Sequence, residues 1–459
     1  MQTNFAPERL KDQATATSEK ILRTCVHCGF CTATCPTYLL LGDELDSPRG
    51  RIYLIKDMLE NDRPATPQVV KHIDRCLSCL SCMTTCPSGV HYMHLVDHAR
   101  SYIEETYERP AMDRAVRSLL AAVLPYQGRF RLALAGAIFG RPLRPLLRRL
   151  PVVGARLGAM LDLAPSRLPS RSPMQGVAAF PPEGRRRGRV AILSGCAQPV
   201  LKPSINEAAV RLLNRNGIEV VFPKGEGCCG ALVHHMGRDA ESLDFARRTI
   251  DAWTAEIEGE GLDAIVITAS GCGTTIKDYG FMLREDPAYA AKAQRVSELA
   301  KDITEYLAEI EWAPPVRPTG DVVTYHSACS MQHGQKIVDL PKKLLKAAGF
   351  VVKDVPEAHI CCGSAGTYNI LQPELASRLR ERKVDNIERT RPAIVATGNI
   401  GCMTQIGKGF ADRGDKTPIV HTVELIDWAT GGPMPEALED AGFAHRPALD
   451  PSPAARAAE

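Results

Sequence analysis

The sequence contains few aromatic residues and carries little net charge. Phe, Trp and Tyr make up 5% of its 459 residues, and the formal net charge is +3. So small an aromatic share argues against a base-stacking surface, and so small a charge does not supply the basic field of nucleic-acid-binding proteins. We therefore expect no nucleic acid among the partners.

Long apolar segments are also absent. No uninterrupted apolar run reaches the length of about 18 residues that a spanning helix needs, and the polar first 20 residues lack the apolar core of a signal peptide. We therefore expect neither a transmembrane helix nor a signal peptide, and a reducing, cytoplasmic location.

The fingerprints of several large enzyme classes are missing as well. The sequence has no P-loop, no nucleophile elbow and no Gly-x-Gly-x-x-Gly after a strand. We therefore expect no flavin or NAD on this chain and assign no catalytic residue. A two-electron substrate oxidation would then take place on a separate flavin subunit.

Cysteine, in contrast, is abundant: the chain has 16, and half of them lie in two short strings. One string runs from Cys25 to Pro36 and the other from Cys76 to Pro87. Both read C-x₂-C-x₂-C-x₃-C-P, which is the spacing that binds [4Fe–4S] clusters. Zinc would leave cysteines of such a string unused, and disulfides would require export.

In two-cluster proteins of this spacing, the fourth cysteine of each string binds the cluster of the other string. The spacing therefore predicts two [4Fe–4S] clusters. We assign the ligands of the first cluster as Cys25, Cys28, Cys31 and Cys86, and those of the second as Cys76, Cys79, Cys82 and Cys35.

Residues 1–110 are expected to form a helical ferredoxin domain around these two strings. Forty residues separate Cys35 from Cys76, which is too many for a short two-hairpin ferredoxin. Ser47 followed by Pro48 predicts the start of a helix between the strings, and a second helix is expected from about Thr66 to Asp74.

Residues 111–188 are expected to form short basic amphipathic helices followed by a linker from Pro165 to Gly188. Two interpretations stay open: contact with a membrane interface, or ordinary packing on the rest of the protein together with a protein partner. No acidic residue lies between residues 129 and 156. Apolar residues there alternate with seven arginines: Arg129, Arg131, Arg141, Arg144, Arg148, Arg149 and Arg156.

Residues 189–430 contain an internal repeat, which divides them into domains at 189–315 and 316–430. Each half alternates strands with helices, which predicts a parallel sheet. The repeat cysteines follow the strands, where ligands of parallel sheets collect. Residues 431–459 are expected to form a flexible tail. Corresponding cysteines are offset by 133, 133 and 130 residues: Cys196 and Cys329, Cys228 and Cys361, Cys272 and Cys402.

Each half therefore offers four thiols that suit one further iron–sulfur cluster. The alternatives are reduced cysteines kept for packing, or a disulfide between neighbours. His326, three residues before Cys329, is a candidate hydrogen-bond donor to a cluster. The candidate ligands in the first half are Cys196, Cys228, Cys229 and Cys272, and those in the second are Cys329, Cys361, Cys362 and Cys402.

The repeated pattern Cys-x₃₁-Cys-Cys-Gly…Cys resembles the cysteine-rich CCG domain of heterodisulfide reductase subunits and of iron–sulfur subunits of flavin-linked dehydrogenases. With the ferredoxin strings and Ser47-Pro48-Arg49-Gly50-Arg51 in front, the chain is most similar to the iron–sulfur subunits of bacterial glycolate oxidase. The resemblance implies an α/β fold: an N-terminal α-helical ferredoxin domain and a pair of pseudo-twofold related parallel α/β CCG domains.

One departure bears on the cofactors. In heterodisulfide reductases the CCG pattern ends in C-x₂-C and supplies five thiolates. Here Thr275 and Gln405 stand where the last cysteine would be. Each half is one ligand short of that arrangement, so one, two or no additional clusters are open for the repeat.

The resemblance implies an electron-transfer subunit of a membrane-associated glycolate oxidase complex. Its partners would be two flavoprotein-type subunits that oxidise glycolate or D-lactate, and its acceptor a quinone. The complex would lie peripherally on the cytoplasmic face of the inner membrane. Two alternatives stay open: a catalytic subunit like that of heterodisulfide reductases, and an iron–sulfur subunit of a glycerol-3-phosphate or L-lactate dehydrogenase.

Overall fold

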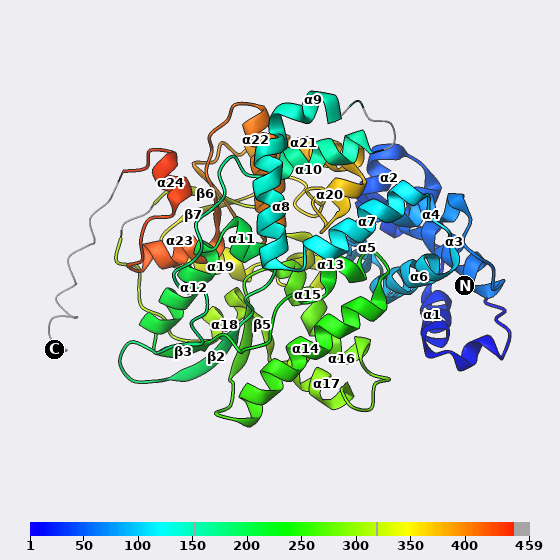
Figure 1. The fold of residues 1–459 in the computed structure, drawn as a ribbon, viewed down its shortest axis with the longest axis horizontal. Coiled ribbons are helices and arrows are strands. Elements are labelled where there is room, and N and C mark those ends of the chain that lie inside the picture. Colours follow the sequence, from blue (N-terminus) through cyan, green and yellow to red (C-terminus); the bar gives the residue numbers. More distant parts are fainter. Residues whose placement is uncertain (148, 150–152, 318–319, 445–459) are drawn as a thin grey trace.

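The computed structural model describes residues 1–147, 149, 153–317 and 320–444. Arg148 and Leu150 of the basic segment and residues 445–459 of the expected tail lie outside the described residues. The N-terminal domain occupies one end of the molecule, two α/β domains occupy the other, and the helices of residues 111–163 extend over both (Figure 1). None of the helices in the described part of the chain combines the length and apolarity of a bilayer span.

The N-terminal domain is helical, as expected. The predicted helix between the strings begins at Pro48, and the Ser47 hydroxyl accepts a hydrogen bond from the Gly50 amide at 3.0 Å. Its buried face, with Ile55 and Leu59, enters the core of the domain. The helices are α1 (Gln13–Thr24), α2 (Pro36–Leu41), α3 (Pro48–Glu60), α4 (Pro67–Asp74), α5 (Ser81–Thr85) and α6 (Tyr92–Thr106), with 3₁₀ turns η1 (Arg9–Lys11), η2 (Phe30–Thr34) and η3 (Glu44–Asp46).

Residues 111–163 form helices, of which α7 buries one apolar face with Val116 and Leu120 as expected, whereas α8 is not amphipathic. On α8, Leu134 is buried, whereas Leu132 and Phe139 are 75% and 84% exposed. The arginines are also not free of acids, because residues outside the run pair with them: Arg144 with Asp162 at 2.7 Å and Arg156 with Asp113 at 2.6 Å. The elements are α7 (Ala111–Val123), α8 (Gln127–Gly140), η4 (Arg141–Leu143), α9 (Arg144–Leu147) and α10 (Gly154–Leu163).

The first α/β domain contains a sheet in the order β1-β3-β2-β4-β5, in which all pairs but β1–β3 are parallel. The expected linker is not wholly a linker, since its residues Ala179–Phe180 add the antiparallel edge strand β1. The other elements are β2 (Gly188–Ile192), α11 (Gln198–Leu201), α12 (Ser204–Arg215), β3 (Ile218–Val221), α13 (Ala231–His234), α14 (Asp239–Glu258), β4 (Ala264–Ile267), α15 (Ser270–Lys277), α16 (Tyr279–Met282), α17 (Ala290–Leu299), β5 (Ala300–Asp302) and α18 (Ile303–Glu309).

The second α/β domain repeats this order with the parallel sheet β7-β6-β8-β9. In register, Val323 pairs with Val352 and Ile394, as Val190 pairs with Val220 and Ala264 in the first sheet. Its elements are β6 (Val322–Tyr325), η5 (Ser330–Gly334), α19 (Leu340–Ala347), β7 (Val351–Asp354), α20 (Tyr368–Leu371), α21 (Pro373–Glu388), β8 (Ile394–Thr397), α22 (Ile400–Asp412), β9 (Ile419–His421), α23 (Thr422–Ala429) and α24 (Glu436–Asp440).

The two α/β domains exchange helix contacts in a symmetric way. Helix α12 of the first packs on α23 of the second, and α19 of the second packs on α18 of the first. One hydrophobic core contains residues of both sheets. The strand ends of the two domains also meet, because the Ser270 amide donates to the Gly398 carbonyl at 3.2 Å. The predicted pseudo-twofold pair is confirmed.

The start of the expected tail differs from the prediction. Met434 and Leu438 are buried in the common core, and α24 forms around Leu438. Residues 431–444 are therefore packed rather than flexible, since they supply apolar side chains that cover the core.

An ionic contact joins the N-terminal domain to the first α/β domain. The ring of His234 on α13 lies 3.3 Å from a carboxylate oxygen of Asp97 on α6 and 3.0 Å from one of Asp239. Burial lowers the pKa of His234, but these two carboxylates outweigh it and raise that pKa to about 10. The charged ring therefore stabilises the folded chain.

This contact predicts a pH dependence of stability. Its contribution is complete below the ordinary histidine pKa of about 6.5 and is lost as pH rises towards the folded value of about 10. We expect the thermal midpoint, measured by circular dichroism, to fall over this range, and to fall less in His234→Gln. His91→Gln is the control, since burial lowers the pKa of His91. Equal slopes in all three proteins would contradict the prediction.

Candidate metal centres

The first group of N-terminal cysteines surrounds a single cavity. Its lining includes Cys25, Cys28, Cys31 and Cys86, so the fourth cysteine of the second string lies beside the first string. Gly29 has a φ of +83°, and a Cβ there would lie 2.5 Å from Nη1 of Arg49. Glycine adopts this left-handed conformation without strain, whereas the second string has Leu80 at the corresponding place with a φ of +61°.

The second group brings Cys35 to the other string. Burial, and then repulsion from Cys79, Cys76 and Cys35, raises the pKa of the Cys82 thiol well above its usual value. Two buried donors face the sulfurs: Arg51 Nη1 donates to Cys35 Sγ and the Tyr92 hydroxyl to Cys76 Sγ, both at 3.8 Å. Such donors favour sulfur in its anionic form.

A buried ionic network holds Arg51 in place. Asp46 is fully buried and accepts hydrogen bonds from Arg51 at 3.4 Å, His72 at 3.0 Å and Arg75 at 2.7 Å. Arg51 also donates to the His72 carbonyl at 2.7 Å. Because a buried charge without partners costs several kcal/mol, the network fixes the guanidinium beside the second cysteine group.

In the first α/β domain, the four cysteines follow the ends of β2, β3 and β4. The Gly230 amide donates to Cys228 Sγ at 3.4 Å. Gly230 has a φ of +83°, and a Cβ would lie 2.8 Å from the Ser242 carbonyl oxygen. Hydrogen bonds to Cys196 and Cys229 lower the pKa of the Cys228 thiol. The group therefore packs its sulfurs against one another.

The second α/β domain repeats this arrangement. Sγ of Cys329 lies 3.7 Å from that of Cys361, and Sγ of Cys362 lies 3.5 Å from that of Cys402. The Gly363 amide donates to Cys361 Sγ at 3.4 Å. Four thiols thus converge in each half.

The last cysteine of each half lies in the first turn of a helix rather than at a strand tip. Cys272 is in α15 and Cys402 in α22, where the Asn399 side chain accepts from the Cys402 amide at 3.2 Å. A helix N-terminus favours negative charge on sulfur. Gln405 does not replace a missing ligand, because its amide bonds to Asn369 and to the Ala376 carbonyl.

The donor sets fit iron–sulfur clusters. All sixteen cysteines fall within the described residues, and none forms a disulfide. Burial raises the pKa of several thiols, among them Cys79 and Cys82, so these thiols stay protonated unless a metal displaces the proton. When bound, such clusters supply one-electron carriers. Four grouped sulfurs with amide donors are the ligation that [4Fe–4S] clusters use.

The second N-terminal group lies against the second α/β domain. The pKa of Cys79 is raised by burial and next by repulsion from Cys329, and Cys79 shares an apolar cluster with Ile360 and Cys361. The Tyr368 hydroxyl donates to the Arg75 carbonyl at 3.1 Å across the same contact. Nothing in the sequence indicates this proximity, because it depends on how the domains pack.

The cysteine groups of both α/β domains face one apolar cavity of about 490 Å³. Helices α7, α8 and α10 cover it with aliphatic side chains such as Leu120, Leu134 and Met160. His235 also lines it, and its buried Nδ1 has no hydrogen-bond partner among the described residues. This cavity has the size of a small-molecule site.

Comparisons with known proteins agree with this architecture. Residues 21–90 match the 4Fe-4S dicluster domain, and residues 190–277 and 323–407 match the Cysteine-rich domain. A crystal structure of a hypothetical protein from Helicobacter pylori has a similar fold, with a TM-score of 0.53 and 10% identity over 88% of this chain and 71% of that one.

Three curated relatives are informative. The glycolate oxidase iron–sulfur subunit of Escherichia coli (strain K12) is 43% identical over 94% of this chain and 99% of its own length. A probable glycolate oxidase iron–sulfur subunit of Bacillus subtilis (strain 168) is 31% identical over 89% of this chain and 94% of its own length. Lactate utilization protein A of Bacillus licheniformis is 27% identical over 52% of this chain and 99% of its own.

The fold and the cysteine groups define an iron–sulfur electron-transfer protein with a dicluster domain and two cysteine-rich domains. The identity over nearly the whole of both chains is more specific. The chain belongs to the family of glycolate oxidase iron–sulfur subunits, which are subunits of an oxidoreductase complex.

Metal content tests the cysteine-rich domains directly. We expect the chain, purified without oxygen, to contain more iron and acid-labile sulfide than the about eight of each that two four-iron clusters supply. Cys362→Ser should lower iron by about four while the dicluster domain keeps its own. Val338→Ser, at an exposed site of the same domain, is the control. About eight irons in all three proteins would leave the repeat without a metal.

Proposed function

We propose that this chain relays electrons within a membrane-associated glycolate oxidase complex, from flavoprotein-type subunits that oxidise glycolate or D-lactate to a quinone. The observation that carries the proposal is a row of neighbouring cysteine groups: Cys82 of the second group also lines the cavity of the first, and Cys79 interacts with Cys329 of the second cysteine-rich domain. The row begins at the protein surface beside the first string and ends at the apolar cavity between the cysteine-rich domains. We place the complex on the cytoplasmic face of the inner membrane.

An exposed apolar patch surrounds the first cysteine group. Cys28 is exposed, and beside it Val26 and Phe30 are 67% and 64% exposed. Tyr53, also exposed, makes an edge contact with the ring of His27. Apolar side chains grouped in this way are typical of a protein-binding surface. This patch is our candidate docking site for a flavoprotein subunit.

The cavity supports a lipophilic acceptor. Its lining is mainly aliphatic, which suits the ring and isoprenoid tail of a quinone better than a charged thiol substrate of the heterodisulfide reductase type. Quinone reduction also consumes protons. His235 is the titratable ring on this wall, and burial lowers its pKa to about 4, so at neutral pH it offers a neutral imidazole to the cavity.

Exposed apolar side chains on the cavity's helical cover support membrane contact. Leu132 and Phe139 project from α8, and Leu143 and Leu146 follow it. The apolar side chains rather than the arginines carry this part of the proposal, since Arg144 pairs with Asp162. A quinone bound between these helices and the cysteine groups would then lie close to the bilayer.

Substrate-driven reduction tests the relay. We expect glycolate to bleach the visible cluster absorption of the chain when it is co-purified with its flavoprotein partners, and not when it is isolated. Glycerol 3-phosphate and L-lactate are the comparison substrates. If either substrate bleaches the clusters faster than glycolate does, that substrate replaces glycolate in the proposal. Reduction of a disulfide by the isolated chain would instead favour a heterodisulfide reductase-like activity.

Filling the cavity tests the acceptor site. Ala137→Trp adds a large side chain to the cavity wall, while Ala135→Trp changes the same helix outside the lining. We expect the first to lower quinone reduction by the complex about tenfold or more, since the indole occupies space that the quinone needs and a binding loss of about 1.4 kcal/mol already gives a factor of about ten, and to leave glycolate-driven bleaching unchanged. Equal quinone reduction in both variants would exclude this cavity as the acceptor site.

Vesicle binding tests the membrane surface. Leu132→Ser with Phe139→Ser removes two exposed apolar side chains and should release the complex from phospholipid vesicles in a flotation assay. Val338→Ser with Val351→Ser, also exposed but distant in sequence, should not. If both double variants float with the vesicles, α8 is not the membrane contact.

A further inference from the structure

His326 is a buried histidine without a hydrogen-bond partner for its ring. It follows β6 directly, and its backbone amide donates to the Ala396 carbonyl at 2.8 Å, which fixes it to the end of the sheet. The residue is 1% exposed, and within the described part of the chain neither Nδ1 nor Nε2 has a partner. A buried polar atom left unpaired costs about 1–3 kcal/mol, so this ring lacks something that it binds.

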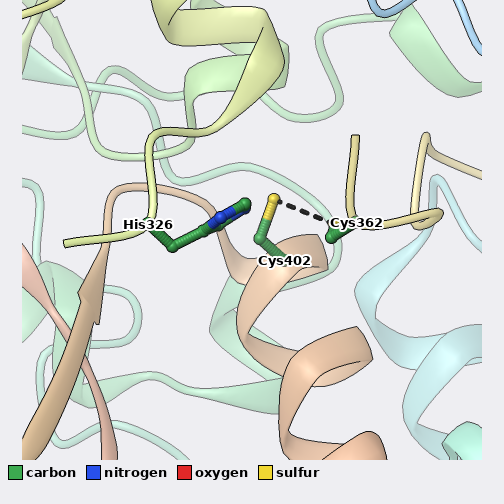
Figure 2. A group of neighbouring side chains, drawn as sticks. All are labelled: His326, Cys362 and Cys402. Atoms are coloured by element: carbon green, nitrogen blue, oxygen red, sulfur yellow. Dashed lines mark hydrogen bonds between the residues drawn. The ribbon is translucent and has the colours of Figure 1, made fainter. Parts of the chain in front are cut away.

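The ring faces the cysteines of the second domain. A nitrogen of His326 and the sulfurs of Cys362 and Cys402 all lie within 4.8 Å of one another. Figure 2 shows the imidazole directed at Cys402 at the start of α22, with Cys362 on the opposite side. Ligand atoms of one metal ion lie within such distances of each other.

The fold itself does not require histidine at this position. The repeat aligns His326-Ser327-Ala328-Cys329 with Leu193-Ser194-Gly195-Cys196, so the first domain has Leu193 at the corresponding place. Leu193 is buried in an apolar cluster with Cys229. A leucine satisfies the packing there, and the histidine therefore serves a purpose that only the second domain has.

A cation that can balance the charge of these cysteines, once a metal has displaced their protons, is already present. Lys383 on α21 is buried, donates to the Glu357 carbonyl at 3.0 Å, and interacts electrostatically with Cys361, Cys362 and Cys402. His326 is therefore not needed as a counter-charge. His326 instead places a ring nitrogen beside the sulfurs of Cys362 and Cys402.

We propose that His326 is a nitrogen ligand of the metal centre in the second cysteine-rich domain, bound to an iron alongside Cys362 and Cys402. This centre then has mixed nitrogen and sulfur ligation, whereas that of the first domain has sulfur alone. Replacing thiolate by histidine raises the reduction potential of an iron–sulfur centre. The second domain, which contacts the dicluster domain through Cys79, is then the stronger electron acceptor of the two.

Nitrogen hyperfine coupling provides the test. The full chain, labelled with ¹⁵N-histidine and purified without oxygen, is reduced stepwise and measured by pulsed electron paramagnetic resonance. We expect a strong nitrogen coupling on a centre that Cys362→Ser eliminates. His326→Leu should abolish the coupling and lower the midpoint potential of this centre, and His359→Gln, which changes a histidine near Cys361, should preserve both.

A further variant separates ligation from folding. His326→Cys supplies a sulfur ligand, so it should keep the iron content of the unaltered chain while losing the nitrogen coupling. A strong coupling that persists in His326→Leu, or a centre in this domain that shows only the weak coupling of a hydrogen-bonded ring, would overturn the proposal. So would an iron content that Cys362→Ser leaves unchanged. Because glycolate-driven bleaching is measured separately, these results do not decide the relay function.

Discussion

The burial of thiols in groups of four is the constraint on which the rest of this structure depends. Sulfurs packed 3.5–3.7 Å apart in an apolar interior would repel one another as thiolates, so they stay protonated until a metal binds and stabilises the anionic form. The local structure is arranged around this requirement. Gly230 and Gly363 allow the backbone to approach closely, and amides donate to Cys228 and Cys361. The last cysteine of each cysteine-rich domain lies at a helix N-terminus.

The duplicated domains meet this constraint in unequal ways. Their strand order, glycines and cysteines correspond, and their helices exchange contacts about a pseudo-twofold relation. Polar groups break the symmetry: the second domain buries His326 and Lys383 beside its sulfurs, and it also contacts Cys79 of the dicluster domain. The repeat therefore contains two similar cysteine groups, and single buried polar side chains make the surroundings of the second group different from those of the first.

Local features could be read from the sequence because they depend on short spacing. The cysteine strings, the helix that begins at Pro48 and three strands of each sheet follow from periodicity, capping and the repeat, whereas the edge strands β1, β5 and β9 were not predicted. The common cavity and the contact between Cys79 and Cys329 could not be predicted, since they arise where separate domains pack. Met434 and Leu438 were expected in a flexible tail, yet both are buried in the common core. Apolar residues are few in this segment, and the surface on which they pack forms only when the two sheets come together, so the sequence does not reveal it.

The positions of the first and last cysteine groups support separate surfaces for the proposed electron donor and acceptor. The first cysteine group is near the surface, where Cys28 and Phe30 are exposed, and a folded partner can approach it directly. The last groups lie behind α7, α8 and α10, where a protein cannot reach and a small lipophilic molecule can. In the relay that we propose, such a chain would accept electrons from a partner subunit and deliver them to a molecule that this subunit does not contact. The aliphatic lining that α7, α8 and α10 give the cavity, rather than the cysteines, would then select the acceptor.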